Sequence, residues 1–224
     1  MSSSVVPTNI SFAAEVMSSF PYPWALCGGW AIDAWLGRVT RDHGDIDITV
    51  FHDDQRALHD HLVGWHLVAH DAINPGPTEE LWAGRELALP VHIHARPPGP
   101  ENLAALMASV LPPYRAAHDG LDFEFVLNPR DGDDLILNED PSTRAALSAY
   151  IDHSPWGLPT VTPAFLLFWK ATAYHDDPRF AKRLAMDEAD FRALLPHLTA
   201  GKRDWLSGAI ATLHPNHPLL SLLD

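Results

Sequence analysis

The hydrophobic and polar positions of the first fifty residues predict a helix, a strand, a second helix and a second strand. Helical spacing of apolar residues continues to about Phe20, with Thr8 or Asn9 as the N-cap, and the segment "PYP" then stops the helix. "WALC" is typical of a short buried strand, Gly28 and Gly29 of a turn, and "WAIDAWLG" of a helix that ends at its glycine. "DIDITVF" alternates acidic and apolar positions before it becomes wholly apolar, which predicts a strand that enters the core.

The middle of the chain predicts mainly strands. A helix capped by Asp53 or Asp54 is expected to run to about Gly64, and another is expected over "PENLAALMASVL", residues 100–111. Strands are expected in "WHLVAHDA", "LALPVHIHA" and "GLDFEFVLN", and in "LILN" after the turn "NPRDGDD". In "GLDFEFVLN" the acids Asp122 and Glu124 share one face, because side chains two apart on a strand point the same way.

From about Trp156 the pattern becomes helical. Three segments carry apolar residues at spacings of three and four, namely "TPAFLLFWKATAYH", "DEADFRALLPHL" and "KRDWLSGAIATLH". "SPWGLPT" is the expected linker that precedes them. The pattern therefore predicts a larger unit over residues 1–155 and a smaller helical unit over residues 156–224.

Composition narrows the classes of partner. The chain of 224 residues has a formal net charge of −14, which would repel nucleic-acid phosphates and anionic lipid and attract a cationic small molecule. Cys27 is the only cysteine, so an intramolecular disulfide is impossible. No signal peptide or membrane-spanning run is recognisable, and a cytoplasmic protein that binds neither nucleic acid nor membrane is expected. The oligomeric state is not predicted.

Two acids on one strand face suggest a metal site. Asp45 and Asp47 project to the same side about 6.5–7 Å apart, and two like charges at that distance favour a bound cation. Carboxylate oxygens suit Mg²⁺, which takes its remaining ligands from phosphates and water. Gly28 and Gly29 let backbone N–H groups approach an anion at the start of the following helix. A phosphate cradle and a metal-binding strand would then face each other.

This combination resembles the nucleotidyltransferase superfamily typified by DNA polymerase beta. The longer string "GGWAIDAWLGRVTRDHGDID" resembles the aminoglycoside and lincosamide nucleotidyltransferases of antibiotic resistance, and the likeness is specific over residues 24–51. "FEFVLNPRDGD", "LLFWKA" and "DEADF" are similar to later landmarks of bacterial proteins in this group. The resemblance implies an α/β (α+β) fold, in which helices flank a mixed β-sheet and a smaller C-terminal helical part closes one side of the cleft.

The resemblance also implies an activity. A nucleoside monophosphate, expected to be AMP from ATP, would move to a hydroxyl of a small molecule, expected to be an aminoglycoside-like antibiotic, and pyrophosphate would be released. Asp45 and Asp47 would hold Mg²⁺. Glu124 is the expected third carboxylate, as metal ligand or as acceptor of the hydroxyl proton, and Asp122 is its substitute.

Several cations are candidates for the triphosphate. Arg38, Arg41 and His43 precede the acids and could contact it, with Arg41 the strongest candidate, because guanidinium groups bind phosphate bidentately. The resemblance implies the same contact for Lys170, and the backbone of Gly28 and Gly29 could bind the phosphates at the start of the helix. Each cation also has a structural interpretation: Arg41 could pair with Asp42, and Lys170 could extend from an apolar helix to solvent. The structural interpretation is preferred for four more residues: Trp30 and Trp35 as core, Asp33 as a helix-locking hydrogen-bond partner, and Asp187 as a helix cap.

Other functions stay open at this point. A lincosamide nucleotidyltransferase and a toxin-type nucleotidyltransferase share the motif. A nucleotide-binding or ligand-binding module of the same fold with weak catalysis is the non-enzymatic alternative. His92 and His94, on one face of their strand, could instead ligate zinc in a hydrolase or line the acceptor pocket.

Overall fold

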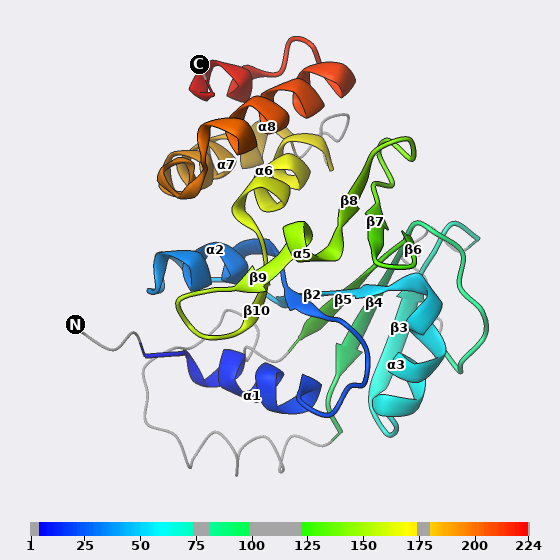
Figure 1. Cartoon of the computed structure of the whole chain (residues 1–224). Helices are drawn as coiled ribbons and strands as arrows, with labels where there is room; N and C mark the ends of the chain where they lie inside the picture. Colours follow the sequence, from blue (N-terminus) through cyan, green and yellow to red (C-terminus); the bar gives the residue numbers. More distant parts are fainter. Residues whose placement is uncertain (1–4, 74–80, 99–121, 174–179, 224) are drawn as a thin grey trace.

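The computed structural model describes residues 5–73, 81–98, 122–173 and 180–223 (Figure 1). The helix expected over residues 100–111 lies outside these ranges. The α-helices are α1 (Thr8–Met17), α2 (Gly28–Leu36), α3 (Gln55–His61), α5 (Leu147–Tyr150), α6 (Pro163–Thr172), α7 (Phe180–Leu194) and α8 (Ala200–Leu213). Short 3₁₀ turns cover His52–Asp54, Leu195–His197 and Pro218–Leu222.

A seven-stranded mixed sheet forms the centre of the molecule. Its spatial order is β3-β4-β5-β2-β1-β10-β9. The strands are β1 (Ala25–Leu26), β2 (Ile46–Phe51), β3 (His66–His70), β4 (Val91–Arg96), β5 (Phe123–Asn128), β9 (Ile151–His153) and β10 (Pro159–Val161). The pairs β2/β5 and β1/β10 are parallel and the others antiparallel. A smaller sheet joins β6 (Arg130–Asp131), β7 (Asp134–Ile136) and β8 (Arg144–Ala146). The expected mixed α/β architecture is confirmed.

The two faces of the central sheet differ in chemistry. One face carries fully buried apolar side chains of β2, β4 and β5, and Phe12 of α1 packs edge-on against Phe123 at 6.0 Å. The opposite face carries polar residues in the alternate positions, among them Asp47, Glu124 and His92. Strand alternation therefore gives one core-forming face and one face that can do chemistry.

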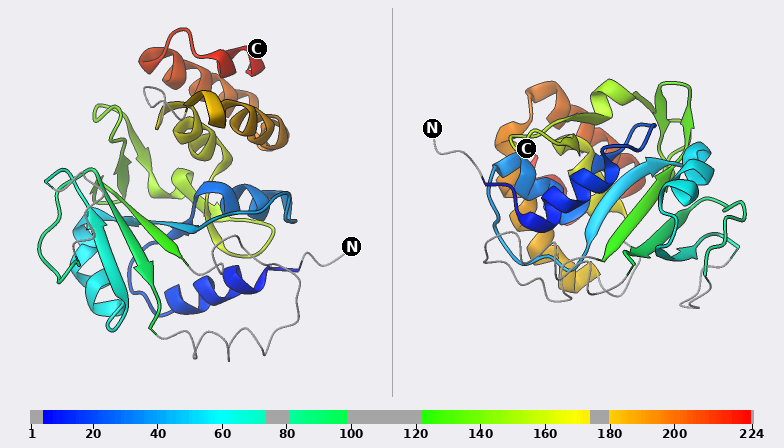
Figure 2. Two further views of the ribbon diagram at one scale, coloured as in Figure 1. Left: turned by 180° about the vertical axis from the view of Figure 1, so that it is seen from behind. Right: turned by 90° about the horizontal axis from the view of Figure 1, so that it is seen from below.

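The C-terminal helices pack together on one side of the sheet. Figures 1 and 2 show α6, α7 and α8 grouped away from α1, and α2 contacts both α6 and α7. From Pro163 on, every described regular element is helical, whereas β10 still belongs to the sheet. The division into units at residue 155 stays a prediction. No helix in the described ranges is both long enough and apolar enough to cross a membrane.

Four local predictions are wrong. Pro7, not Thr8 or Asn9, precedes α1. Helix α2 already begins at Gly28, so the glycines form its first turn instead of a separate turn. The expected linker "SPWGLPT" contributes a buried Trp156 and strand β10, because its proline and glycine form the hairpin between β9 and β10. Asp187 lies inside α7 and caps nothing, since that helix begins at Phe180.

Candidate active site

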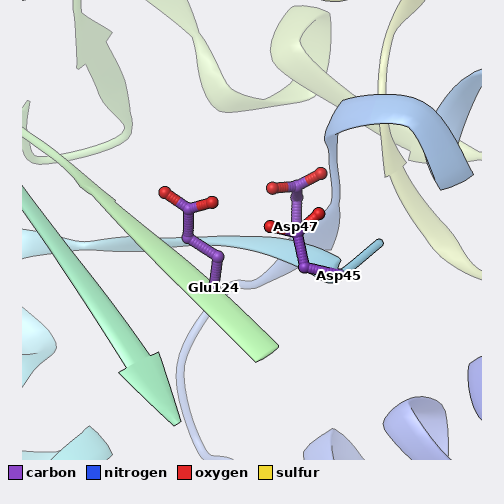
Figure 3. A group of neighbouring side chains, drawn as sticks. All are labelled: Asp45, Asp47 and Glu124. Carbon is purple, nitrogen blue, oxygen red and sulfur yellow. The ribbon is translucent and has the colours of Figure 1, made fainter. Parts of the chain in front are cut away.

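Three carboxylates meet on the polar face of the sheet. In the parallel pair β2/β5, Asp47 lies directly beside Glu124, and Asp45 immediately precedes β2. One oxygen from each of these residues lies within 4.8 Å of those of the other two. Figure 3 shows the carboxylates of Asp47 and Glu124 on the same side of their strands. Strand register therefore assembles the cluster that the sequence expected from Asp45, Asp47 and one acid of "FEFVLN".

Glu124, and not Asp122, completes this cluster. Asp122 precedes β5 and accepts a hydrogen bond from Nε of Arg96 at 2.6 Å, in a pair whose two side chains are 31% and 69% exposed. It therefore sits at the rim as one half of a surface ion pair.

Crowding of negative charge perturbs the titration of the cluster. Burial raises the pKa of Asp47 well above its usual range, and the charges of Asp45 and Glu124 raise it further, while Lys170 acts against them. Burial and Glu124 also raise the pKa of Asp45. Burial alone would raise the pKa of Glu124 too, but a hydrogen bond from His92 and the nearby imidazoles bring it below its usual range. The site therefore holds more negative charge than its own surroundings neutralise.

The glycine pair at the start of α2 leaves room for the site side chains. Gly28 has a φ of +61°, and a Cβ on it would lie 1.8 Å from Oδ2 of Asp47. A Cβ on Gly29 would lie 2.4 Å from Nδ1 of His43 and 2.8 Å from Nη2 of Arg41. Any larger residue would displace these groups, so the motif is required by close packing around the carboxylates as well as by access for an anion.

The loop between α2 and β2 is held by Asp33. Its carboxylate accepts hydrogen bonds from the hydroxyl of Thr40 at 2.5 Å and from Nε2 of His43 at 2.7 Å. Arg41 donates to Nδ1 of His43 at 2.8 Å, so both ring nitrogens of this buried histidine are engaged. Asp33 thus locks the loop that follows its helix, while contact of Arg41 and His43 with a triphosphate stays a prediction.

Lys170 of α6 lies among acids of α7. Its Nζ donates to Oδ1 of Asp187 at 3.0 Å and lies 2.7 Å from Oδ2 of Asp190. Asp190 also pairs with Nη2 of Arg41 at 3.5 Å. Arg41 therefore pairs with α7 instead of with Asp42, to whose carbonyl it makes only a long hydrogen bond of 3.4 Å. Two cations expected at the triphosphate thus converge on one helical aspartate, and Lys170 does not extend to solvent.

The histidine strand β4 contacts the site at Glu124. Nδ1 of His92 donates to Oε1 of Glu124 at 2.5 Å. His94 is exposed, and its ring centroid lies 5.4 Å from that of His70. Within the described ranges, the only cluster of three potential metal-ligating side chains is that of Asp45, Asp47 and Glu124. A zinc site on His92 and His94 therefore gains no third ligand there.

Two sets of contacts near the site were not predicted from the sequence. The pairing of Asp187 and Asp190 with Lys170 could have been suspected, because residues three apart share a helix face. The contact of His92 with Glu124 depends on the register of β4 against β5, for which the sequence carries no signal beyond alternation. Trp30 and Trp35 occupy structural positions as expected: Trp30 is buried against the ring of His43, and Trp35 donates to the carbonyl of Val161.

The donor set fits Mg²⁺. Hard carboxylate oxygens at mutual distances under 4.8 Å are the ligands this ion prefers. Burial and mutual repulsion raise the pKa values of Asp45 and Asp47, and a divalent cation would offset both effects by stabilising the ionised carboxylates. Proteins usually hold Mg²⁺ through one or two carboxylates, and this cluster has three. Asp45 and Asp47 are enough to hold the ion, so Glu124 is available for a second role.

Comparisons with known proteins agree with the motif. Residues 10–77 match the family model of aminoglycoside-2''-adenylyltransferase. A stretch of 27 residues is 70% identical to 2''-aminoglycoside nucleotidyltransferases of Escherichia coli and Klebsiella pneumoniae. That stretch is 12% of this chain and spans only 15% of the length of these relatives.

Solved structures extend the likeness to the whole fold. The crystal structure of ANT(2")-Ia in complex with adenylyl-2"-tobramycin superposes with a TM-score of 0.54 at 18% identity, over 92% of this chain and 96% of that one. The lincomycin-bound lincosamide antibiotic adenylyltransferase LnuA superposes with a TM-score of 0.50 at 12% identity, over 85% and 96% of the two chains. Residues 10–77 are therefore similar to the aminoglycoside-2''-adenylyltransferases, and the fold of the chain is similar to the folds of ANT(2")-Ia and LnuA.

Proposed function

We propose that this protein transfers a nucleoside monophosphate, AMP from ATP, to a hydroxyl of an aminoglycoside-like antibiotic and releases pyrophosphate. The observation that carries the proposal is the cluster of Asp45, Asp47 and Glu124 beside the glycine turn of α2. The family match and the names of the relatives support the same reaction class.

Each site residue has a role in this reaction. Asp45 and Asp47 would hold Mg²⁺, which supplies charge neutralisation for the triphosphate and orients its leaving group. The acceptor oxygen forms a bond to the α-phosphorus as the bond to the bridging oxygen of the β-phosphate breaks, and the electron pair leaves with pyrophosphate. Glu124 takes the proton of the acceptor hydroxyl, because its pKa is held low enough to keep it ionised.

The cations of the site would receive the triphosphate. Arg41 can hold phosphate oxygens bidentately, and Lys170 offers a point charge close enough to influence Asp47. Both are paired with Asp190, so phosphate binding would exchange one anionic partner for another. His43 holds Arg41 in place through its ring nitrogen.

A cationic acceptor suits the charge of the protein. The formal net charge of −14 favours approach of a polycationic aminoglycoside over that of a neutral or monocationic lincosamide. LnuA, a lincosamide antibiotic adenylyltransferase, has a similar fold, which makes a lincosamide the second acceptor to test.

The test is an acceptor screen. The purified protein with ATP and Mg²⁺ should release pyrophosphate with tobramycin, and mass spectrometry should find the adenylylated product. Asp47→Asn should reduce the rate by at least about 10³-fold, because it removes a carboxylate from the site of charge neutralisation. Turnover with lincomycin alone would reassign the acceptor. Binding of Mg·ATP without pyrophosphate release from either acceptor would favour a binding module instead.

A further inference from the structure

We propose that His92 is a positioning residue for Glu124, holding the third carboxylate of the site in the orientation that the transfer reaction requires. This inference rests on the proposed function. It assigns to "VHIHA" a role that differs from both a zinc site and a pocket wall.

The contact is direct and comes from a fixed element. His92 lies on β4, which pairs antiparallel with β5 so that His92 stands opposite Val126, one same-face position along from Glu124. Its Nδ1 lies 2.5 Å from Oε1 of Glu124. Diagonal neighbours of this kind lie within reach of long side chains. The imidazole therefore meets the carboxylate on the side away from β2, which carries Asp47.

A carboxylate has two oxygens, and in this inference one binds the imidazole while the other serves the reaction. One oxygen of Glu124 accepts from the imidazole, and the group still contributes an oxygen to the cluster with Asp45 and Asp47. A hydrogen bond to the oxygen turned toward β4 fixes the rotation of the whole carboxylate plane. The oxygen that serves the reaction is thereby aimed, because the two oxygens of one carboxylate cannot rotate independently.

The length of glutamate explains why such support is needed. Its side chain has one more rotatable bond than that of aspartate, so fixing a glutamate costs more rotamer entropy. Glu124 also carries the same charge as Asp45 and Asp47, whose carboxylate oxygens lie within 4.8 Å of its own. A donor on the neighbouring strand opposes both effects. Outer groups that orient functional carboxylates in this way typically change activity by about 10- to 100-fold when removed.

The kinetic test compares two substitutions at position 92. With tobramycin and lincomycin as acceptors, His92→Ala should lower kcat by about 10- to 100-fold while the KM for ATP changes by less than about twofold. His92→Asn should restore most of the lost kcat, because the amide nitrogen of asparagine can occupy the place of Nδ1. The matched control is His66→Ala, which removes an exposed histidine from β3, two strands away from Glu124.

A second measurement tests the contact without any substrate. A double-mutant cycle of urea unfolding should show that His92→Ala shifts the midpoint in the wild type by a different amount than in Glu124→Gln. Additive shifts would show that the two side chains do not interact.

The outcomes separate this inference from the proposed function. If Asp47→Asn and Glu124→Gln abolish transfer while His92→Ala keeps the wild-type kcat, only the positioning role is overturned. Equal losses in His92→Ala and His92→Asn, with both folded, also overturn it. A protein inactive with both acceptors overturns the proposed function and the positioning role together, even where the unfolding cycle detects the contact.

Discussion

The residues of the glycine motif are closely packed against one another. Gly28 leaves the space that Asp47 occupies, and Gly29 leaves the space for His43 and Arg41. Asp33 then holds His43 from the other side of its ring. The motif therefore specifies a shape around the carboxylates, and each member can be tested by a change of one or a few atoms.

Gly28→Ala is expected to remove activity with a moderate loss of stability. The added Cβ would overlap Oδ2 of Asp47, and alanine at a φ of +61° is strained. We expect kcat/KM to fall by at least about 100-fold and the free energy of unfolding by about 1–3 kcal/mol. Steady-state kinetics and urea unfolding measure the two effects.

Gly44→Ala is the matched control for this change. Gly44 lies in the loop between α2 and β2, and a Cβ placed on it meets nothing within 4 Å. It should leave the unfolding free energy within about 1 kcal/mol of the wild type. A Gly28→Ala variant as active as the wild type would show that Asp47 has no fixed position near α2.

At the scale of elements, α7 supplies the counter-charges that α6 and the α2–β2 loop need. The side chains of Lys170, Asp187 and Asp190 are each exposed by less than a tenth of their surface. Burying a charge is tolerated only when partners compensate it. The helices therefore depend on one another through this ion cluster as well as through apolar packing.

Asp190→Asn is expected to destabilise the protein. Lys170 would keep only its pair with Asp187, and Arg41 would lose its pair with Asp190. We expect the free energy of unfolding to fall by about 2–4 kcal/mol. Glu188→Gln on the same helix is the control, since its pair with Arg192 is largely exposed and should contribute less than about 0.5 kcal/mol. Chemical denaturation of both variants decides the matter, and equal effects would contradict the buried-pair argument.

Most strands could be predicted from the sequence because they alternate clearly. "DIDITVF" and "GLDFEFVLN" give β2 and β5, and their alternation correctly separates the apolar face from the face of Asp47 and Glu124. The choice of Glu124 over Asp122 as the third carboxylate agrees with the cluster, although no alternation rule distinguishes them. That choice depended on how costly an acid is in an apolar strand.

The remaining features depended on long-range pairing. Aspartate is a residue type typical of helix caps, yet α7 begins seven residues before Asp187, at Phe180. The local preference of Asp187 for a cap position is therefore overridden by tertiary packing. "SPWGLPT" has the composition of a linker, but Trp156 is buried and β10 pairs with β1. Turn residues mark a change of direction without showing whether the chain leaves the sheet or returns to it.

For the molecule as a whole, the acid cluster costs stability when no metal is bound. The pKa values of Asp45 and Asp47 are raised in the folded protein by burial and mutual repulsion. A raised pKa means that the folded state holds these protons more tightly than the unfolded chain does. Their stabilising contribution is thus present below about pH 4 and is lost as the pH rises through the raised values.

Asp47→Asn should therefore raise the melting temperature of the metal-free protein at pH 8, by about 2–4 °C for each kcal/mol of repulsion relieved. The gain over the wild type should shrink as the pH falls toward 4, because the raised pKa leaves Asp47 protonated and uncharged in the folded protein there. Mg²⁺ should raise the Tm of the wild type and not that of the variant. Melts with EDTA and with MgCl₂ across this pH range measure all three effects. A variant less stable than the metal-free wild type at pH 8 would refute the argument.

The reciprocal fit around Gly28, Gly29 and Asp33 has an evolutionary consequence. A substitution at one residue of this set disrupts the position of its partner, so these residues should be conserved together. They lie within the 68 positions, 10–77, that match the family model. His94, at the exposed part of the polar sheet face, lies outside this set of contacts. If the proposed transfer is the function, selection for a different acceptor should therefore change β4 before it changes Gly28, Gly29 or Asp33.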